Sequence, residues 1–239
     1  MNIVNDLKGG TLIDRMFKAG AHFAYSKSRR HPSAKPYIFG VKNRVEIFDL
    51  EKTEELLKNA RQFVMSLGKE GKTLLFVGGK AEARDAVRSG AKSVEMPYVA
   101  GRWIGGTITN FGQIKSRINK LADLLAQREK GELAKYTKKE RLLIDREIDR
   151  LNVYFSGLSS LKDLPKALFV IDSGREKIAV EEAHKAGIPV VALAGSDCDL
   201  KQVEYPIVGN DSSVASISLF LNEITSAYQE GKKSQKVEV

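Results

Sequence analysis

A glycine turn, Val77-Gly78-Gly79-Lys80, is the first place where this chain could support catalysis. It lies between an apolar run and a helical segment, where many α/β proteins set a phosphate group on a helix N-terminus. The turn lacks the third glycine of a dinucleotide fingerprint and the Gly-Lys-Ser/Thr ending of a P-loop. A tight strand-to-helix turn is therefore favoured. An α/β nucleotide-binding enzyme that uses Gly78, Gly79 and Lys80 is the alternative.

Three carboxylates, Asp172, Asp197 and Asp199, follow the C-terminal ends of two expected strands. Parallel sheets usually bind ligands at that edge, and carboxylate oxygens are suitable ligands for Mg²⁺. Asp-Ser and Ser-Asp pairs are also ordinary helix caps and Asx turns, which is the favoured interpretation. Whether any of the three holds an ion stays open from sequence alone.

The histidines and the cysteine predict neither a metal centre nor a nucleophile. His22, His31 and His184 are scattered, and none is one helical turn from another histidine. Cys198 is the single cysteine, so no internal disulfide is available. We expect no cofactor, no catalytic residue and a reducing, cytoplasmic setting.

A basic loop from Ala24 to Arg44 carries a stronger signal, because it contains no acidic residue. Three aromatic residues, Tyr25, Tyr37 and Phe39, are interleaved with the charges. Such a mixture offers contacts to phosphates together with surfaces on which bases stack. The charged residues that we expect to bind RNA here are Lys27, Arg29, Arg30, His31, Lys35, Lys42 and Arg44.

A second basic cluster follows the sequence Arg102-Trp103. The further residues that we expect to bind RNA are Arg102, Trp103, Lys115, Arg117 and Lys120. Packing of Trp103 into the core is an equal alternative, and the charges on the following helices could also form only a solvated exterior.

The elements that must position these residues form a parallel α/β domain. Short apolar runs alternate with helical segments, and parallel strands need such crossovers. We therefore predict a doubly wound sheet covered on both faces. The expected strands are residues 45–48, 73–77, 93–96, 167–171, 189–194 and 205–208. The expected helices are one that is capped by Asp49 or Thr53 and ended by Gly68, and two more at 81–89 and 176–186, with a loop over residues 24–44.

An insertion interrupts this alternation between Gly105 and Gly157. Apolar residues recur there at spacings of three and four, from Phe111 to Leu125 and again from Ile144 to Leu158. This pattern predicts an antiparallel coiled-coil helical hairpin with a polar tip at residues 127–140. Two helices lying flat on the sheet are the alternative. The predicted domains are residues 1–105 with 158–228, the hairpin 106–157 and a flexible basic tail 229–239.

A final helix with an apolar face is expected from Val214 to Tyr228, after Asn210 and Asp211 as a helix cap. Bulk composition adds the sign of the partner: 239 residues carry a formal charge of +9 and a pI near 9.5, which favours a polyanion. Residues 1–10 do not resemble a secretory leader, and no run of about 18 apolar residues occurs, so we expect a soluble protein without a membrane partner.

With these residues in view, the chain resembles the bacterial type of small-subunit ribosomal protein two, the S-two family, over nearly its whole length. The matching blocks are Ala19 to Phe23 with Lys35 to Gly40, Asp49 to Thr53, Arg102 to Phe111, and Pro165 to Asp172 with Gly187 to Pro189 and Gly209 to Asp211. The resemblance implies a flavodoxin-like sheet with an inserted hairpin. It also implies a place in the small ribosomal subunit, with contacts to ribosomal RNA, neighbouring ribosomal proteins and the large first protein of the subunit.

The chain departs from that family in the basic loop. Where the family has Gly-His and then Arg-Arg-Trp-Asn-Pro, this sequence has Ala24-Tyr25 and Ser28-Arg29-Arg30-His31-Pro32. Val208 stands where a proline is expected, and residues 212–216 lack the usual acidic and arginine residues. The expected function is non-catalytic binding of ribosomal RNA and not of DNA. A protein-docking module in which the hairpin matters more than the loop is a third possibility.

Overall fold

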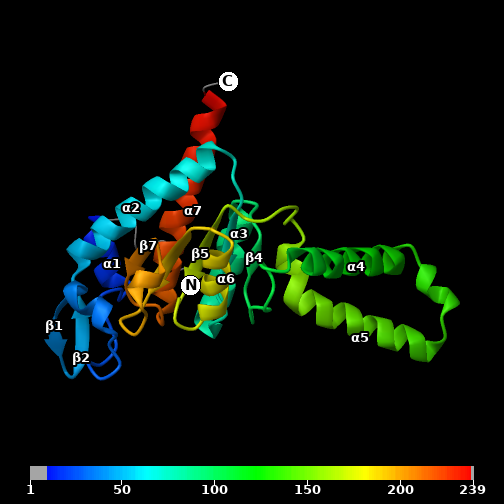
Figure 1. Ribbon diagram of the computed structural model, residues 1–239, viewed down its shortest axis with the longest axis horizontal. Coiled ribbons are helices and arrows are strands. Elements are labelled where there is room, and N and C mark those ends of the chain that lie inside the picture. The colour runs from blue at the N-terminus through cyan, green and yellow to red at the C-terminus, as the bar shows by residue number, and fades with distance from the viewer. Residues whose placement is uncertain (1–9, 238–239) are drawn as a thin grey trace.

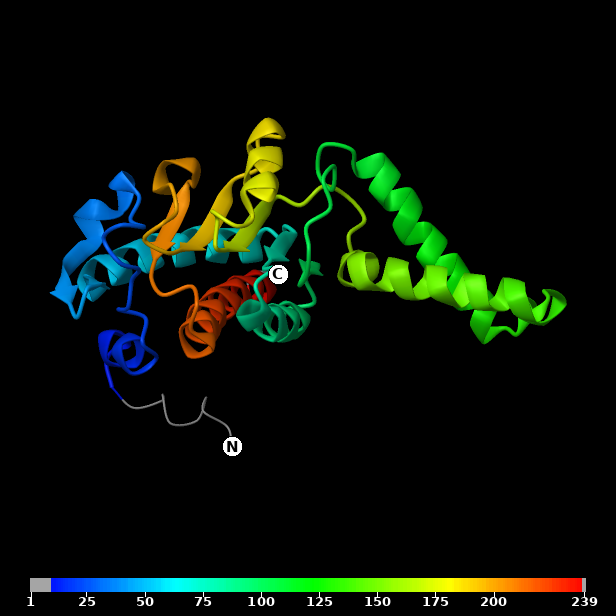
Figure 2. The same ribbon diagram turned by 90° about the horizontal axis from the view of Figure 1, so that it is seen from below.

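The computed structural model describes residues 10–237. A five-stranded parallel sheet in the order β4-β3-β5-β6-β7 forms its centre (Figures 1 and 2). The strands are β3 (Leu74–Val77), β4 (Tyr98–Val99), β5 (Ala167–Ile171), β6 (Val190–Ala194) and β7 (Tyr205–Val208). The helices are α1 (Leu12–Lys18), α2 (Leu50–Lys69), α3 (Ala81–Ser93), α4 (Phe111–Glu129), α5 (Lys138–Phe155), α6 (Lys177–Lys185) and α7 (Val214–Val237). The prediction of a doubly wound α/β domain is confirmed.

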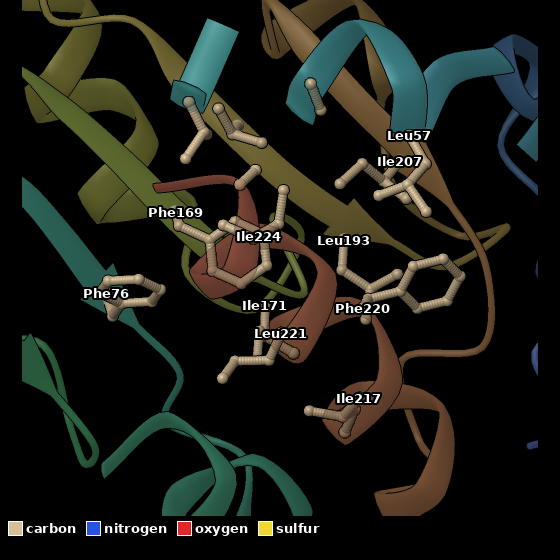
Figure 3. Close-up of a cluster of buried hydrophobic side chains, with 14 of the residues drawn as sticks. Leu57, Phe76, Phe169, Ile171, Leu193, Ile207, Ile217, Phe220, Leu221 and Ile224 are labelled. Atoms are coloured by element: carbon tan, nitrogen blue, oxygen red, sulfur yellow. The ribbon is translucent and has the colours of Figure 1, made fainter. Parts of the chain in front are cut away.

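Alternate residues of each strand enter two different cores, as the pleat of a sheet requires. Phe76, Phe169 and Leu193 point to the face covered by α2, α3 and α7 (Figure 3). Val77 and Val170 belong to the opposite core, which includes α6 and the buried sides of α4 and α5. Burial on both faces explains why the strands read as continuous apolar runs.

The helices α4 and α5 extend away from the sheet as an antiparallel pair (Figures 1 and 2). Their buried residues lie on the facing sides: Ile114, Ile118 and Leu121 on α4 and Ile148, Leu151 and Phe155 on α5. Thr137 forms a capping box with Glu140 and so begins α5. The flat arrangement of these helices on the sheet is not the one adopted.

The expectations for one strand, one loop and the C-terminal tail differ from the structure. The strand expected at residues 93–96 is wrong, because α3 continues to Ser93 and the pairing residues are Tyr98 and Val99. The loop expected over residues 24–44 contains a short 3-10 helix, Pro32–Tyr37, and the strand β1 (Ile38–Lys42), which pairs antiparallel with β2 (Val45–Phe48). Consecutive left-handed residues, Asn43 and Arg44, close this β-hairpin.

The expected flexible tail is also wrong as far as residue 237, because α7 continues to Val237. Gly231 lies against Gly68 of α2, and a side chain at either position would collide with the other helix. Tyr228 additionally donates its hydroxyl to the Lys72 carbonyl at 3.1 Å. Close packing between two helices therefore holds the segment that its polar composition had suggested was free. The expectations for residues 1–9 and 238–239 lie outside the described residues.

Candidate nucleic-acid interface

The glycine turn after β3 is closed by the protein itself. The Gly79 N–H donates to Oε1 of Glu176 at 3.1 Å, so a carboxylate already takes the donor that a nucleotide phosphate would need. A side chain at Gly78 would collide with Val87 and Ala83 of α3, which shows that close packing requires this glycine. The turn is the tight strand-to-helix connection that the sequence favours.

Lys80, the residue directly before α3, forms ion pairs inside the protein. Its Nζ lies 2.7 Å from Oδ2 of Asp172 and 2.8 Å from Oδ2 of Asp211. Burial lowers the pKa of Lys80, but the neighbouring Asp211 and Asp172 raise it more, so the ammonium stays charged. Asp211, expected as a helix cap, is thus an ion-pair partner, while Oδ1 of Asn210 accepts the N–H groups of Ser212 and Ser213.

The three carboxylates that could have held Mg²⁺ have separate partners. Asp172 binds Lys80, Asp197 pairs with Arg29 at 3.2 Å, and Asp199 accepts the Lys201 N–H at 3.1 Å and caps a short 3-10 helix. Burial raises the pKa of the nearby Cys198 thiol to about 12, so this cysteine is a neutral packing residue. Capping and ion pairing account for these groups.

The basic loop is held firmly on the C-terminal edge of the sheet. The Tyr25 N–H donates to Oγ of Ser196 at 3.1 Å, and the His31 N–H donates to the Ser196 carbonyl at 2.8 Å. The Tyr25 hydroxyl lies 2.7 Å from Oγ of Ser212. One face of the Tyr25 ring carries the Arg29 guanidinium, 4.2 Å from the ring centroid. The loop is therefore a pre-organised surface.

Some of the expected RNA-binding residues are engaged within the protein. Arg30 pairs at 2.7 Å with Glu46, whose side chain is only 1% exposed. His31 Nδ1 accepts the Ser33 N–H at 3.3 Å. The remaining basic residues of the loop are exposed and make no ion pair within residues 10–237; they are Lys27, Lys35, Lys42 and Arg44.

Phe39 stands out among the aromatic residues of the loop, because it is 80% exposed. It lies at an irregularity in the β1–β2 pairing, between Ile38 and Gly40. Tyr25 and Tyr37 are partly buried by comparison. Of the three stacking surfaces expected from the sequence, Phe39 is the one fully available to a base.

The second basic cluster divides in the same way. Trp103 is buried and donates its indole N–H to Oε1 of Glu182 at 3.2 Å, so it packs into the core as the alternative expected, and a contact of this residue with RNA stays a prediction. Lys115 donates to the Lys162 carbonyl at 2.8 Å, and Lys120 pairs with Glu147 at 3.1 Å. Arg102 and Arg117 are exposed and make no ion pair among the residues described.

Glu182 of α6, which composition and spacing did not single out, fixes the loop at the base of the α4–α5 hairpin. Besides Trp103, its carboxylate accepts the N–H groups of Gly106, Ile108 and Thr109 at 2.7, 3.0 and 3.2 Å. Burial raises the pKa of Glu182, but the bonds from Ile108 and Gly106 and then Trp103 hold it below its ordinary value. One ionised carboxylate thus orders the whole turn.

The structure keeps the two basic clusters apart. The β1–β2 hairpin lies at one end of the long axis of the molecule, and α4 and α5 extend toward the other (Figure 1). Among residues 10–237, no helix is both long and apolar enough to cross a bilayer. The arrangement offers surfaces for a polyanion at two sites.

Comparison with known proteins gives a consistent result. Residues 16–231 match the family model described as ribosomal protein S2. The chain is 45% identical over 217 residues to small ribosomal subunit protein uS2 of Sulfurimonas denitrificans, covering 91% of this chain and 84% of the relative. It is 39% identical over 234 residues to the protein of the same name from Chloroflexus aggregans, covering 98% of each. The relative from Coprothermobacter proteolyticus is 42% identical over 224 residues, which cover 94% of this chain and 84% of the relative.

Proposed function

Because the chain belongs to the ribosomal protein S2 family, we propose that it binds ribosomal RNA and neighbouring ribosomal proteins as a structural constituent of the small subunit. The family is structural and not enzymatic. In this role the chain acts in the cytoplasm, bound to the ribosome, and supports subunit assembly and translation. The protein acts by binding its partners and not by catalysing a reaction.

One observation carries the proposal: exposed lysines and arginines without ion-pair partners among residues 10–237 lie on a rigid scaffold. Lys27, Lys35, Lys42 and Arg44 belong to the same loop as the exposed ring of Phe39. Hydrogen bonds from Tyr25 and His31 to Ser196 fix the part of the loop that carries Lys27. Because the backbone of that part of the loop is already ordered, mainly the side chains lose conformational freedom when the cations contact phosphates.

Salt dependence tests this mechanism. If about 6 phosphates are contacted, affinity for small-subunit ribosomal RNA falls roughly a thousandfold between 50 and 200 mM salt. Changing Lys42 and Arg44 to Gln lowers the slope by about 1 for each phosphate that is no longer neutralised. Changing Lys58 and Lys69 of α2 to Gln removes the same charge elsewhere and serves as control. A nearly flat response of the unaltered protein contradicts the mechanism.

The hairpin tip, residues 127–140, is proposed to contact a neighbouring ribosomal protein, among which the large first protein of the subunit is the leading choice. Replacing this tip with a short glycine-rich turn leaves the buried contacts of Ile118 and Ile148 in place. We expect RNA binding to persist and co-sedimentation with small subunits to weaken. Unchanged co-sedimentation would show that the tip is not an anchor.

A further inference from the structure

A hollow of about 330 Å³ opens beside the closed glycine turn, and neither RNA-binding cluster includes it as a whole. Its lining consists of Gly79, Arg84, Arg102, Trp103, Arg175, Glu176 and Ile178. These residues come from the segments that follow β3, β4 and β5. Three separate segments, including the first turns of α3 and α6, therefore converge on one concave site at the C-terminal edge of the sheet.

The position of the hollow is the one at which open α/β sheets bind ligands. From β3, the chain crosses to β4 on one side, while β5 lies on the other side of β3. Loops that leave neighbouring strands in opposite directions create a crevice between them. Gly79 after β3 and Arg175 after β5 lie on the two sides of that crevice.

Charge gives the hollow its chemistry. Arg84, Arg102 and Arg175 are all exposed, and none makes an ion pair within the part of the chain that the structure describes. The one carboxylate in the lining, Glu176, is 6% exposed and accepts the Gly79 N–H. Three guanidinium groups thus outnumber one largely buried carboxylate, which selects for an anion. Planar guanidinium forks match the oxygens of a phosphate group.

The walls of the hollow favour a phosphate that carries an organic substituent. Ile178 is 57% exposed beside the arginines, and Trp103 provides a buried aromatic wall. Glu182 fixes the Trp103 ring through its indole N–H. The site is therefore pre-formed, with charged groups for the phosphate and an apolar side chain for a ribose or base.

We propose that this hollow binds a backbone phosphate of ribosomal RNA, held by Arg84, Arg102 and Arg175. The inference rests on the proposed function and adds Arg84 and Arg175, which lie outside both basic clusters, to the RNA-binding residues. RNA is favoured over a free nucleotide because Glu176 occupies the Gly79 donor that nucleotide phosphates use in such turns.

The test compares two double variants of the full chain. Arg84→Gln with Arg175→Gln removes two guanidinium groups from the hollow. Arg88→Gln with Lys177→Gln removes the same charge from the same two helical regions, at positions outside the lining. The measurement is the affinity for in-vitro-transcribed small-subunit ribosomal RNA as a function of salt. The double variant Arg84→Gln with Arg175→Gln, called the hollow variant, should lose roughly tenfold in RNA affinity and about 1 in the salt slope, whereas the control double variant should lose neither.

Fluorescence gives a second, local measurement. Trp103 is the only tryptophan of the chain and lines the hollow, so its emission should change when RNA binds and change less in the hollow variant. ATP with Mg²⁺ is the probe for a free nucleotide. Saturable quenching by ATP that blocks the RNA response would overturn the choice of RNA.

Equal RNA affinities and salt slopes for the two double variants would overturn the inference. In that case, a steep salt response of the unaltered protein would leave the proposed function intact. A flat response of the unaltered protein would contradict the proposed function instead, and circular dichroism of all three proteins checks that each is folded.

Discussion

The two halves of the C-terminal sheet edge use arginine in opposite ways. Beside β6 and β7, Arg29 and Arg30 pair with Asp197 and Glu46, and their charges hold the basic loop in place. Beside β3, β4 and β5, the arginines of the hollow have no such partners among residues 10–237. A basic residue near an expected RNA surface is therefore not a binding residue by its type alone. Its nearest carboxylate decides whether it stabilises the fold or remains available to a partner.

The largest loss of stability is expected from Lys80→Met, because Lys80 is a basic residue that is fully engaged in internal ion pairs. The substitution leaves Asp172 and Asp211 buried beside each other without a cation. Breaking such a buried pair costs about 3–5 kcal/mol. Urea unfolding should show a matching fall in stability, and Asp172→Asn combined with Asp211→Asn and Lys80→Met should recover part of it. A midpoint unchanged by Lys80→Met would show that the cluster contributes nothing.

Arg30→Ala tests the buried pair of the basic loop directly. Glu46 would lose its partner while remaining almost fully buried, so we expect a loss of roughly 3 kcal/mol in the free energy of unfolding. Arg102→Ala is the matched change in the hollow and should alter stability by less than about 0.5 kcal/mol while weakening RNA binding. Equal stability losses for the two variants would remove the distinction between the two halves.

Glu182→Gln should destabilise the protein by about 1–3 kcal/mol at neutral pH, because several buried donors lose an ionised acceptor. The folded pKa of Glu182 lies below its ordinary value, so its ionised form contributes stability above the ordinary pKa. That contribution is lost as the pH falls through the folded pKa. The gap between the urea midpoints of wild type and variant should therefore narrow toward acidic pH, and a constant gap would contradict this account.

Among the ion-paired residues, the smallest loss of stability is expected from Arg29→Ala. This guanidinium is 60% exposed in its ion pair with Asp197, and water screens such pairs strongly. We expect a stability change of about 0.5 kcal/mol, which includes the removal of the guanidinium from the face of the Tyr25 ring. Thermal unfolding at low and high salt measures it, and a decrease comparable to that of Arg30→Ala would show that exposure does not rank these pairs.

Sequence patterns predicted the elements whose apolar residues recur within one segment. They failed where the structure of a segment depends on contacts with residues far away in the sequence. The continuous apolar runs of β3 and β5 identify buried parallel strands, because both of their faces are covered. The strand β4 was not predicted, because it consists only of Tyr98 and Val99 and is too short to show a periodic pattern. Gly231 lies in a polar segment, and its contact with Gly68 depends on a helix that lies far away in the sequence.

Contacts between residues far apart in the sequence also explain which features of the candidate sites the sequence did not predict. The acid-free stretch of the basic loop suggested that all its charges were available, yet Asp197 comes from the loop after β6 and Glu46 from the strand that follows the basic loop. The pairing of Lys80 with Asp211 joins residues that are 131 positions apart. Arg84 and Arg175 carry no local pattern that distinguishes them from solvated charges. Ion pairs form in three dimensions, whereas spacing reports only on one element at a time.

The carboxylate of Glu182 also has a mechanical consequence. It holds the turn from which α4 leaves the domain, and α4 spans 19 residues, or roughly 28 Å. A tilt of about 5° at that pivot would swing the far end of this arm by roughly 2.5 Å, about the length of a hydrogen bond. The direction in which the α4–α5 pair leaves the domain therefore depends on a few hydrogen bonds to one side chain of α6.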